Sequence, residues 1–293
     1  MKYEAICTYS PEHSVRKMCK VLGLRECGYY QWLYRLKKNE TKREAECMLA
    51  KKIREIFVKN KEIYGYRKMQ RALEKEGIYL SEYRVRKIMK TTGLYPVVVK
   101  KYKPNHNGKQ DGRFYNNIVN QKFTASKPNE VWTGDITYIK TDQGWVYLAT
   151  VIDLYNKEVV GYSVSKNIDS ELVKKALGNA LVRIDTERSD IIFHSDRGCQ
   201  YSSKAYQSML NQYGITGSMS RPACPYDNAC SESFFSSAKR ECIYRKKYVT
   251  IEEVKQDLFE YIELFYNRKR MHSSLGYMSP VEYRLLNTSE KAC

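Results

Sequence analysis

Three carboxylates stand at positions where a carboxylate needs a functional explanation. Asp135 falls in the middle of an apolar, β-branched run, although aspartate is disfavoured inside strands. Asp196 directly follows the apolar run 191–194, at the point where open α/β sheets place their functional groups. Glu232 stands early in an expected helix. If these side chains converge at one sheet edge, they repel one another when ionised, and a hard divalent cation relieves that repulsion.

Such a site supports chemistry on a phosphodiester. Two divalent cations about 4 Å apart activate a nucleophile and stabilise the leaving oxygen. Ligands that are all carboxylates favour Mg²⁺, with Mn²⁺ as a substitute. Each carboxylate alone is more often a turn or cap residue, and four others compete on that basis: Asp142, Asp153, Asp169 and Asp227. Asp153 is the strongest rival because it lies in the next expected strand, although it can simply complete that strand's end.

Lys239 follows Glu232 by seven residues, which is two helical turns, so both side chains lie on one face together with Ser236. A long cationic side chain there can reach a DNA phosphate or steady the carboxylates, which makes Lys239 a candidate functional residue. The alternative is a solvated lysine. Arg240, rotated by about 100°, is the ordinary neighbour against which it can be compared.

The elements that must position these residues change in periodicity along the chain. β-Branched and aromatic runs at 131–139, 146–154 and 159–164 have short joins, which predicts three antiparallel strands in a meander. Further elements are expected as helix 170–181, strand 191–194, helix 203–212, strand 215–219, a loop with Pro222 and Pro225, and helices 229–242 and 251–268. Asp227 or Asn228 can cap the helix that carries Glu232. This order predicts a mixed α/β sheet.

The N-terminal part shows two helix-turn-helix patterns. In the first, Ser14 can cap a helix that Gly23 ends, and a second helix follows through Leu33. In the second, a helix after residues 64–67 stops at Gly77, and Ser81 opens another that ends at Gly93. Six basic residues of this second unit are the expected DNA-binding residues: Arg67, Lys68, Arg84, Arg86, Lys87 and Lys90. The alternative is an ordinary helical bundle with solvated charges.

The positive charge is concentrated in this N-terminal part. Of the net +18, residues 1–126 carry 29 Lys and Arg against 12 Asp and Glu, whereas residues 127–240 carry 13 against 13. A basic module of this kind condenses on a polyanion and releases counterions, which favours nucleic acid as the partner. We therefore expect a DNA-binding region at 1–96, a basic linker at 97–126, a catalytic core at 127–240 and a C-terminal helical extension at 241–293.

Several classes of protein are disfavoured. No apolar run approaches the ~18 residues that span a membrane, and residues 1–11 do not look like a signal peptide. The nine cysteines are odd in number and include no Cys-x-x-Cys pair, so we expect reduced thiols, and the four scattered histidines argue against a zinc site.

The flanking sequences carry a family resemblance that covers nearly the whole chain. Thirty-five residues separate Asp196 from Glu232. The stretches concerned are 64–67 (Tyr-Gly-Tyr-Arg), 132–138 (Trp-Thr-Gly-Asp-Ile-Thr-Tyr), 194–198 (His-Ser-Asp-Arg-Gly), 226–229 (Tyr-Asp-Asn-Ala), 232–235 (Glu-Ser-Phe-Phe), and Tyr266, Asn267, Arg270, His272, Ser273, Leu275, Gly276, Tyr277, Ser279 and Pro280. Together they resemble the insertion-sequence-three family of bacterial transposases, specifically its second-frame (OrfB) product, within the retroviral-integrase group of DDE transposases.

The resemblance implies a ribonuclease-H-like fold for residues 127–240 and a triad of Asp135, Asp196 and Glu232 that binds two Mg²⁺ ions. It implies direct attack on the phosphodiester by water or a DNA 3′-hydroxyl, and in the family a Lys or Arg at the spacing of Lys239 accompanies the glutamate. Implied partners are the element's terminal inverted repeats, target DNA, further copies of the chain and an upstream-frame (OrfA) product, in the bacterial cytoplasm on the nucleoid. The His/Cys zinc module of retroviral integrases is missing from this sequence.

The leading interpretation is therefore a transposase that cuts and joins DNA. A nuclease of the same fold would use the same carboxylates without joining strands. A DNA-binding regulator with a silent catalytic site is the third reading, although all three carboxylates are intact.

Overall fold

The computed structural model describes residues 2–97, 114–121, 124–184, 190–221 and 224–289. The chain divides into two compact units, Met1–Tyr95 and Pro96–Cys293, each of which is described by itself. Helices make up the first unit, and a mixed five-stranded sheet with helices forms the second, which confirms the expected fold class.

The first unit begins with α1 (Lys2–Tyr9), α2 (Val15–Val21) and the start of α3 (Glu26–Lys59). Ile6, Cys19 and Tyr29 form their common core, with Trp32 packed against it. The helix expected after Ser14 is confirmed, but the Ser14 side chain makes no capping hydrogen bond.

Helix α3 runs much further than the sequence pattern predicted. It continues for 34 residues to Lys59, and its middle is exposed on every side. That stretch contains neither glycine nor proline and is rich in lysine, arginine and glutamate, which favour a helix without needing a packed face.

The second helix-turn-helix unit is formed by the end of α3, α4 (Tyr66–Lys75) and α5 (Glu82–Thr91). Its buried residues are Ile53, Ile56, Phe57, Met69, Leu73, Val85 and Met89. The Ser81 hydroxyl caps α5 by accepting a hydrogen bond from the Arg84 backbone N–H at 3.3 Å. Gly77 and Gly93 follow the two helices with φ of +79° and +69°, as expected for residues that end a helix.

The sheet of the second unit has the strand order β3-β2-β1-β4-β5. The meander is confirmed as β1 (Val131–Thr141), β2 (Gly144–Asp153) and β3 (Val159–Ser165), which pair antiparallel. The other two strands, β4 (Ile192–Ser195) and β5 (Thr216–Met219), are short. Strand β4 pairs parallel with β1, and β5 pairs parallel with β4.

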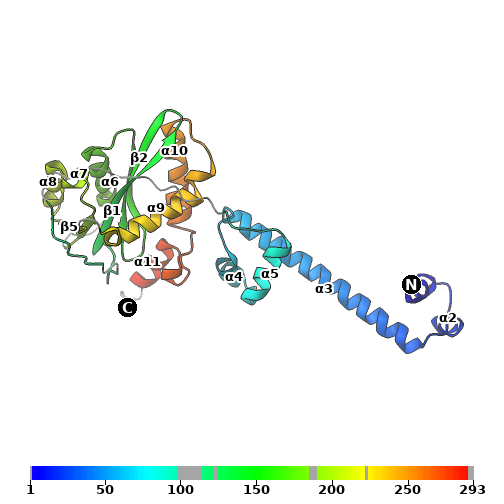
Figure 1. Cartoon of the computed structure of the whole chain (residues 1–293). Helices are drawn as coiled ribbons and strands as arrows, with labels where there is room; N and C mark the ends of the chain where they lie inside the picture. The colour runs from blue at the N-terminus through cyan, green and yellow to red at the C-terminus, as the bar shows by residue number, and fades with distance from the viewer. Residues whose placement is uncertain (1, 98–113, 122–123, 185–189, 222–223, 290–293) are drawn as a thin grey trace. The chain divides into compact units, whose positions relative to one another are not determined.

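Helices cover both faces of this sheet (Figure 1). On one face, α6 (Ser170–Val182), α7 (Cys199–Ser202) and α8 (Lys204–Gln212) enclose a core that includes Trp132 and Phe193. Helix α6 comes so close to β3 that a Cβ on Gly161 would lie 2.4 Å from the Ala176 carbonyl oxygen. On the other face lies α9 (Ala229–Glu241), because Thr133 bonds to α9 and successive strand residues point to opposite faces.

Residues 114–121 lie against the sheet and are not part of a free linker, which corrects the second half of the expected 97–126 segment. The Tyr115 ring covers Gly217 of β5, and Val119 is buried with Val131 and Leu154. The Ile118 backbone N–H also donates to the Ser218 hydroxyl at 3.0 Å. Burial of the Tyr115 and Val119 side chains against the sheet is more favourable than their exposure to water in a solvated linker would be. Residues 98–113 lie outside the described part of the chain.

The C-terminal extension packs onto the same unit. It comprises η2 (Ile243–Arg245), α10 (Ile251–Phe259), a π-helix η3 (Glu260–Tyr266), η4 (Ser273–Leu275) and α11 (Pro280–Ser289). The helix expected over 251–268 therefore changes to π geometry at Glu260. Just after it, the Asn267 side chain bonds the backbone N–H and C=O of Val159 on β3, both at 3.0 Å. In the residues that the structure describes, no helix is long and apolar enough to cross a membrane.

Candidate active site and nucleic-acid interface

The sheet register places Asp135 and Asp196 side by side. The parallel pairing of β1 with β4 ends at Gly134 opposite Ser195, so Asp135 is the next residue of β1 and Asp196 directly follows β4. Neighbouring strands lie about 4.8 Å apart. Each carboxylate is steadied by a backbone N–H: Ile136 donates to Asp135 Oδ1 at 2.7 Å, and Gly198 donates to Asp196 Oδ1 at 2.9 Å.

Helix α9 carries Glu232 and Lys239 over the face from which Asp135 projects. The Thr133 hydroxyl donates to Asn228 Oδ1 at 2.9 Å and lies 3.2 Å from the Ser231 hydroxyl, which holds the first turn of α9 on β1. Because Asp135 is two residues beyond Thr133, its side chain lies on the same face of the strand.

The expected cap position of α9 is confirmed for Asn228, but neither Asn228 nor Asp227 caps the helix through its side chain. Asn228 is the N-cap residue but makes no side-chain capping hydrogen bond, since its Oδ1 accepts from Thr133. The Asp227 carboxylate is used elsewhere, by Arg221 and by two amide side chains from residues 117–121.

Asp135 interacts electrostatically with the other three expected catalytic residues, Asp196, Glu232 and Lys239. Burial raises the pKa of Asp135 well above its usual range, the neighbouring Asp196 carboxylate raises it further, and Glu232 adds to the effect. The Ile136 amide and the Lys239 ammonium act in the opposite direction. Burial lowers the pKa of Lys239, and Asp135 partly offsets this; its Nζ lies 4.8 Å from the centroid of the Tyr138 ring.

Arg240 differs from Lys239 in this respect. Its side chain is exposed, and its Nε donates back to the Ser236 carbonyl of its own helix at 3.1 Å. The helical spacing therefore separated a residue that faces the carboxylates from one that faces solvent.

The donor set fits a divalent metal by its chemistry, although it is not closed around one. Across the described ranges, no group of three His, Cys, Asp or Glu side chains is gathered tightly enough to hold an ion. Asp135 nevertheless feels the charge of both other carboxylates, each of which adds to the larger effect of burial in raising the Asp135 pKa. Oxygen donors with unbalanced negative charge are what Mg²⁺ requires.

Asp153 lies outside this group. It pairs with Trp132, three residues before Asp135 on β1, which corresponds to about 10 Å along the strand. Its carboxylate accepts hydrogen bonds from the backbone N–H of Asn129 and of Tyr155, both at 2.9 Å. Burial raises its pKa to about 6. These contacts are those of a residue that shapes a strand end.

Of the remaining rivals, Asp169 caps α6 by accepting from the Leu172 N–H at 3.0 Å, and Asp142 is exposed in a turn.

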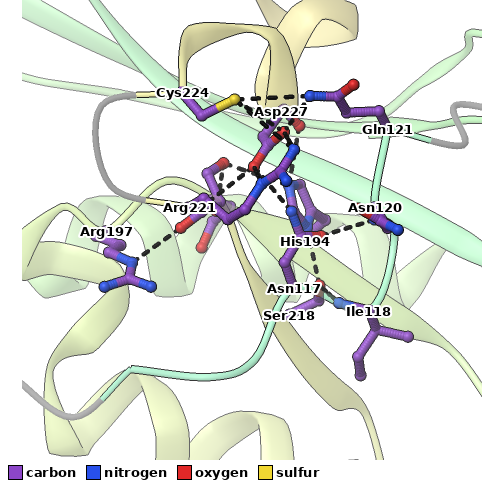
Figure 2. Close-up of polar contacts among 12 residues, drawn as sticks. Asn117, Ile118, Asn120, Gln121, His194, Arg197, Ser218, Arg221, Cys224 and Asp227 are labelled. Carbon is purple, nitrogen blue, oxygen red and sulfur yellow. Dashed lines mark hydrogen bonds and ion pairs between the residues drawn. The ribbon is translucent and has the colours of Figure 1, made fainter.

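Asp227 organises the loop between β5 and α9, a function that the sequence did not predict. Its carboxylate accepts from the Arg221 backbone N–H at 2.8 Å, from the Arg221 Nε and Nη2 at 3.2 Å each, from Asn117 Nδ2 at 2.8 Å and from Gln121 Nε2 at 2.9 Å. The Arg221 guanidinium is the main reason why the pKa of Asp227 is held well below its usual range. Figure 2 shows these side chains converging on Asp227.

His194 ties this loop to the end of β4. Its Nε2 donates to the Asp227 carbonyl at 2.9 Å, because a carbonyl can only accept, so its Nδ1 accepts from the Ser218 hydroxyl at 2.9 Å. Burial lowers its pKa, which keeps the ring neutral. The His194 ring thus links the end of β4, just before Asp196, to Asp227, which precedes the helix that carries Glu232 (Figure 2). The sequence signal was the position of His194 two residues before Asp196.

The expected DNA-binding residues gather on one module of the first unit. On α5, the side chains of Arg84, Arg86, Lys87 and Lys90 are exposed, whereas Val85 and Met89 are buried. The guanidinium groups of Arg67 and Arg86 lie 5.6 and 5.8 Å from the centroid of the Tyr66 ring, and Lys68 Nζ lies 5.7 Å from that of Tyr64. The six residues therefore present a basic surface with aromatic rings among the charges.

Known protein families match both the catalytic part and the helix-turn-helix part of the chain. Two family models described as integrase core domain match residues 125–225 and 232–287, and one described as HTH-like domain matches residues 44–102. The last range covers the second helix-turn-helix unit and not the first.

Relatives of the whole chain are insertion-sequence transposases. The chain is 37% identical over 287 residues to transposase InsF of insertion sequence IS3A from Escherichia coli strain K12, covering 98% of this chain and 99% of that protein. It is 39% identical over 252 residues to the transposase of insertion sequence element IS904 from Lactococcus lactis, covering 86% of this chain and 98% of that protein. A chain of the simian T-cell lymphotropic virus intasome structure aligns with a TM-score of 0.46 and 16% identity over 73% of this chain and 70% of its own.

An integrase core behind an HTH-like domain defines the class: the chain is a DNA-binding enzyme of the DDE polynucleotidyl transferase class. Within this class, the near full-length identity shows that it belongs to the IS3 family of insertion-sequence transposases.

Proposed function

We propose that the chain catalyses Mg²⁺-dependent strand cleavage and strand transfer at the ends of an insertion sequence, with Asp135, Asp196 and Glu232 as the metal-binding triad. The observation that carries this proposal is the β1–β4 register. In that register Gly134 lies opposite Ser195, the residues that directly precede Asp135 and Asp196, and Ser231 in the first turn of the helix that bears Glu232 lies against Thr133 of β1. Mn²⁺ would substitute for Mg²⁺ because the ligands are carboxylates.

The two cations would supply activation of the nucleophile and stabilisation of the leaving oxygen. In cleavage, a water oxygen bonds to phosphorus, the bond from phosphorus to the 3′ oxygen breaks, and that oxygen leaves as a hydroxyl. In transfer, this 3′-hydroxyl bonds to a target phosphorus and releases the target's own 3′ oxygen, which takes up a proton. The number of phosphodiester bonds is conserved in transfer, so no external energy source is needed.

The protein's own residues position and balance charge in these steps. The backbone N–H groups of Ile136 and Gly198 hold the two aspartates as ligands. Lys239 supplies a half-buried positive charge beside Asp135, where it can contact the phosphate of the reacting strand.

For DNA recognition, we propose that the basic surface of α4 and α5 binds the element's terminal inverted repeats and that the catalytic core binds target DNA. We further propose that several copies of the chain assemble on DNA, that an upstream-frame (OrfA) product is a partner, and that the chain acts in the cytoplasm on the nucleoid.

A strand-transfer assay separates the three candidate activities. The full chain is mixed with a duplex that carries one element end and with a target plasmid, in Mg²⁺ or EDTA. Joined product in Mg²⁺ alone supports the transposase; cut but unjoined DNA indicates a nuclease. Binding that is equal in both conditions, with no cutting, indicates a silent regulator.

A further inference from the structure

Arg197 directly follows Asp196, and its side chain is held in place by two contacts. Its Nε donates to the Ser220 carbonyl at 2.8 Å, and its guanidinium carbon lies 4.8 Å from the centroid of the Phe114 ring. The side chain is half-buried. Figure 2 shows that the guanidinium lies apart from the contacts that converge on Asp227. The orientation of the group is therefore set before any ligand arrives.

The two terminal nitrogens of Arg197 are not used in these contacts. Among the described residues, Arg197 makes no ion pair, and Nη1 and Nη2 make no hydrogen bond. Arginine stays protonated, and its planar fork matches the paired oxygens of a phosphate. A fixed guanidinium with open donors is the arrangement that binds an anion at low entropic cost.

Binding of DNA at the catalytic core requires a positively charged side chain that can offset the negative charge of the site. Residues 127–240 carry no net charge, with 13 Lys and Arg against 13 Asp and Glu, and the Asp135, Asp196 and Glu232 carboxylates would repel a DNA backbone. The nearby Arg221 is paired with Asp227, and Lys239 lies over Tyr138 beside Asp135. Of these three cations, Arg197 directly follows Asp196, and within the described part of the chain its Nη1 and Nη2 remain available to donate.

We propose that Arg197 binds a phosphate of the DNA strand that passes Asp196, and that Phe114 and the Ser220 carbonyl orient it for this contact. The proposal rests on the DNA-cutting and DNA-joining function proposed above. The phosphate belongs either to the element end or to the target, and the test has one arm for each. The competing interpretation is structural: Arg197 merely braces residues 114–121 against the end of β5.

The test is a chemical double-mutant cycle on the full-length chain, which measures joining of a pre-cleaved element end to a target duplex in Mg²⁺. In one series, single phosphates of the element end are replaced in turn by neutral methylphosphonates; in the other, those of the target are replaced. The variants are Arg197→Ala and Arg197→Gln, with Lys204→Ala as a matched loss of one exposed positive charge from α8 of the same unit.

A charged hydrogen bond contributes about 1.5–3 kcal/mol, so neutralising the partner phosphate should slow the wild type by roughly tenfold to a hundredfold. On unmodified DNA, Arg197→Ala should be slowed to a similar extent and should lose its sensitivity at that one position. Lys204→Ala should keep the wild-type profile. The series in which the sensitive position appears identifies the source of the phosphate.

The proposal is overturned if Arg197→Ala joins at the wild-type rate, or if it keeps full sensitivity at every position. If Arg197→Ala does not fold, Arg197→Gln, which keeps much of the side-chain stem, answers the same question. A brace would lower the melting temperature of either variant and leave the methylphosphonate profile unchanged. Joining by the wild type on unmodified DNA tests the proposed function separately, so failure of one does not imply failure of the other.

Discussion

The end of α9 is held by a buried ion pair whose loss should be costly. Glu241, the last residue of α9, receives Arg270 Nε and Nη2 at 2.7 Å each and the Tyr261 hydroxyl at 2.8 Å. Both charged side chains are only 10% exposed. Glu241→Gln removes one charge and leaves the other uncompensated in the interior.

The expected loss follows from that burial. Breaking a buried pair by removing one partner costs about 3–5 kcal/mol, whereas replacing both partners with apolar residues is often neutral or stabilising. Glu241→Gln should therefore be much less stable than the double variant Glu241→Leu/Arg270→Met. The matched control is Glu171→Gln, whose pair with Lys174 is 2.7 Å long but has a carboxylate that is 59% exposed and a lysine that is 30% exposed. Solvent screening limits that loss to about 1 kcal/mol.

Urea unfolding of the full chain, followed by circular dichroism at pH 7, measures these differences. Because the pair also fixes the helix that carries Glu232 and Lys239, Glu241→Gln should slow strand joining while DNA binding by the first unit persists. Equal free-energy losses for Glu241→Gln and Glu171→Gln would refute the reasoning. So would a double variant that is as unstable as the single one.

Three further predictions concern single residues. Lys239→Ala should slow joining of pre-cleaved ends at least tenfold more than Arg240→Ala, as expected from a charge contact of about 1.4 kcal/mol or more; equal rates would return Lys239 to a structural role. Asp153→Asn should leave joining intact, and loss of activity there would contradict the assigned triad. Because the Asp153 pKa is raised to about 6, the stability of the wild type relative to Asp153→Asn should be greatest below about pH 4 and should decline up to about pH 6; a pH-independent difference in urea unfolding would contradict this. Arg84→Ala should reduce the slope of log affinity against log salt by about 0.9 if it contacts a phosphate, and an unchanged slope would remove it from the interface.

Much of the site could be predicted from residue types and spacing. The sequence placed Asp135 in the middle of one strand and Asp196 directly after another. These positions become neighbours once the two strands pair, and β1 and β4 do pair in the structure. Helical geometry predicted that Lys239 and Arg240 lie on different faces of α9, and the structure places them so.

Other features depend on partners that are distant in sequence. Asp227 looked like a helix cap, but Asn117 and Gln121, more than 100 residues earlier, occupy its carboxylate. The same fold-dependent contacts draw residues 114–121 onto the sheet. The length of α3 was missed for another reason: its polar middle packs against nothing in the described structure, so it has no apolar periodicity to detect.

The central claim is that Asp135, Asp196 and Glu232 form one metal-dependent catalytic site. The most direct measurement is strand joining in Mg²⁺ by Asp135→Asn, Asp196→Asn and Glu232→Gln, each of which keeps the side-chain shape and removes one negative charge. Each should lose more than about 100-fold in rate while binding element-end DNA as the wild type does, since positioning and charge stabilisation are both lost. Wild-type joining by any one of the three, with DNA binding and folding intact, would contradict the account.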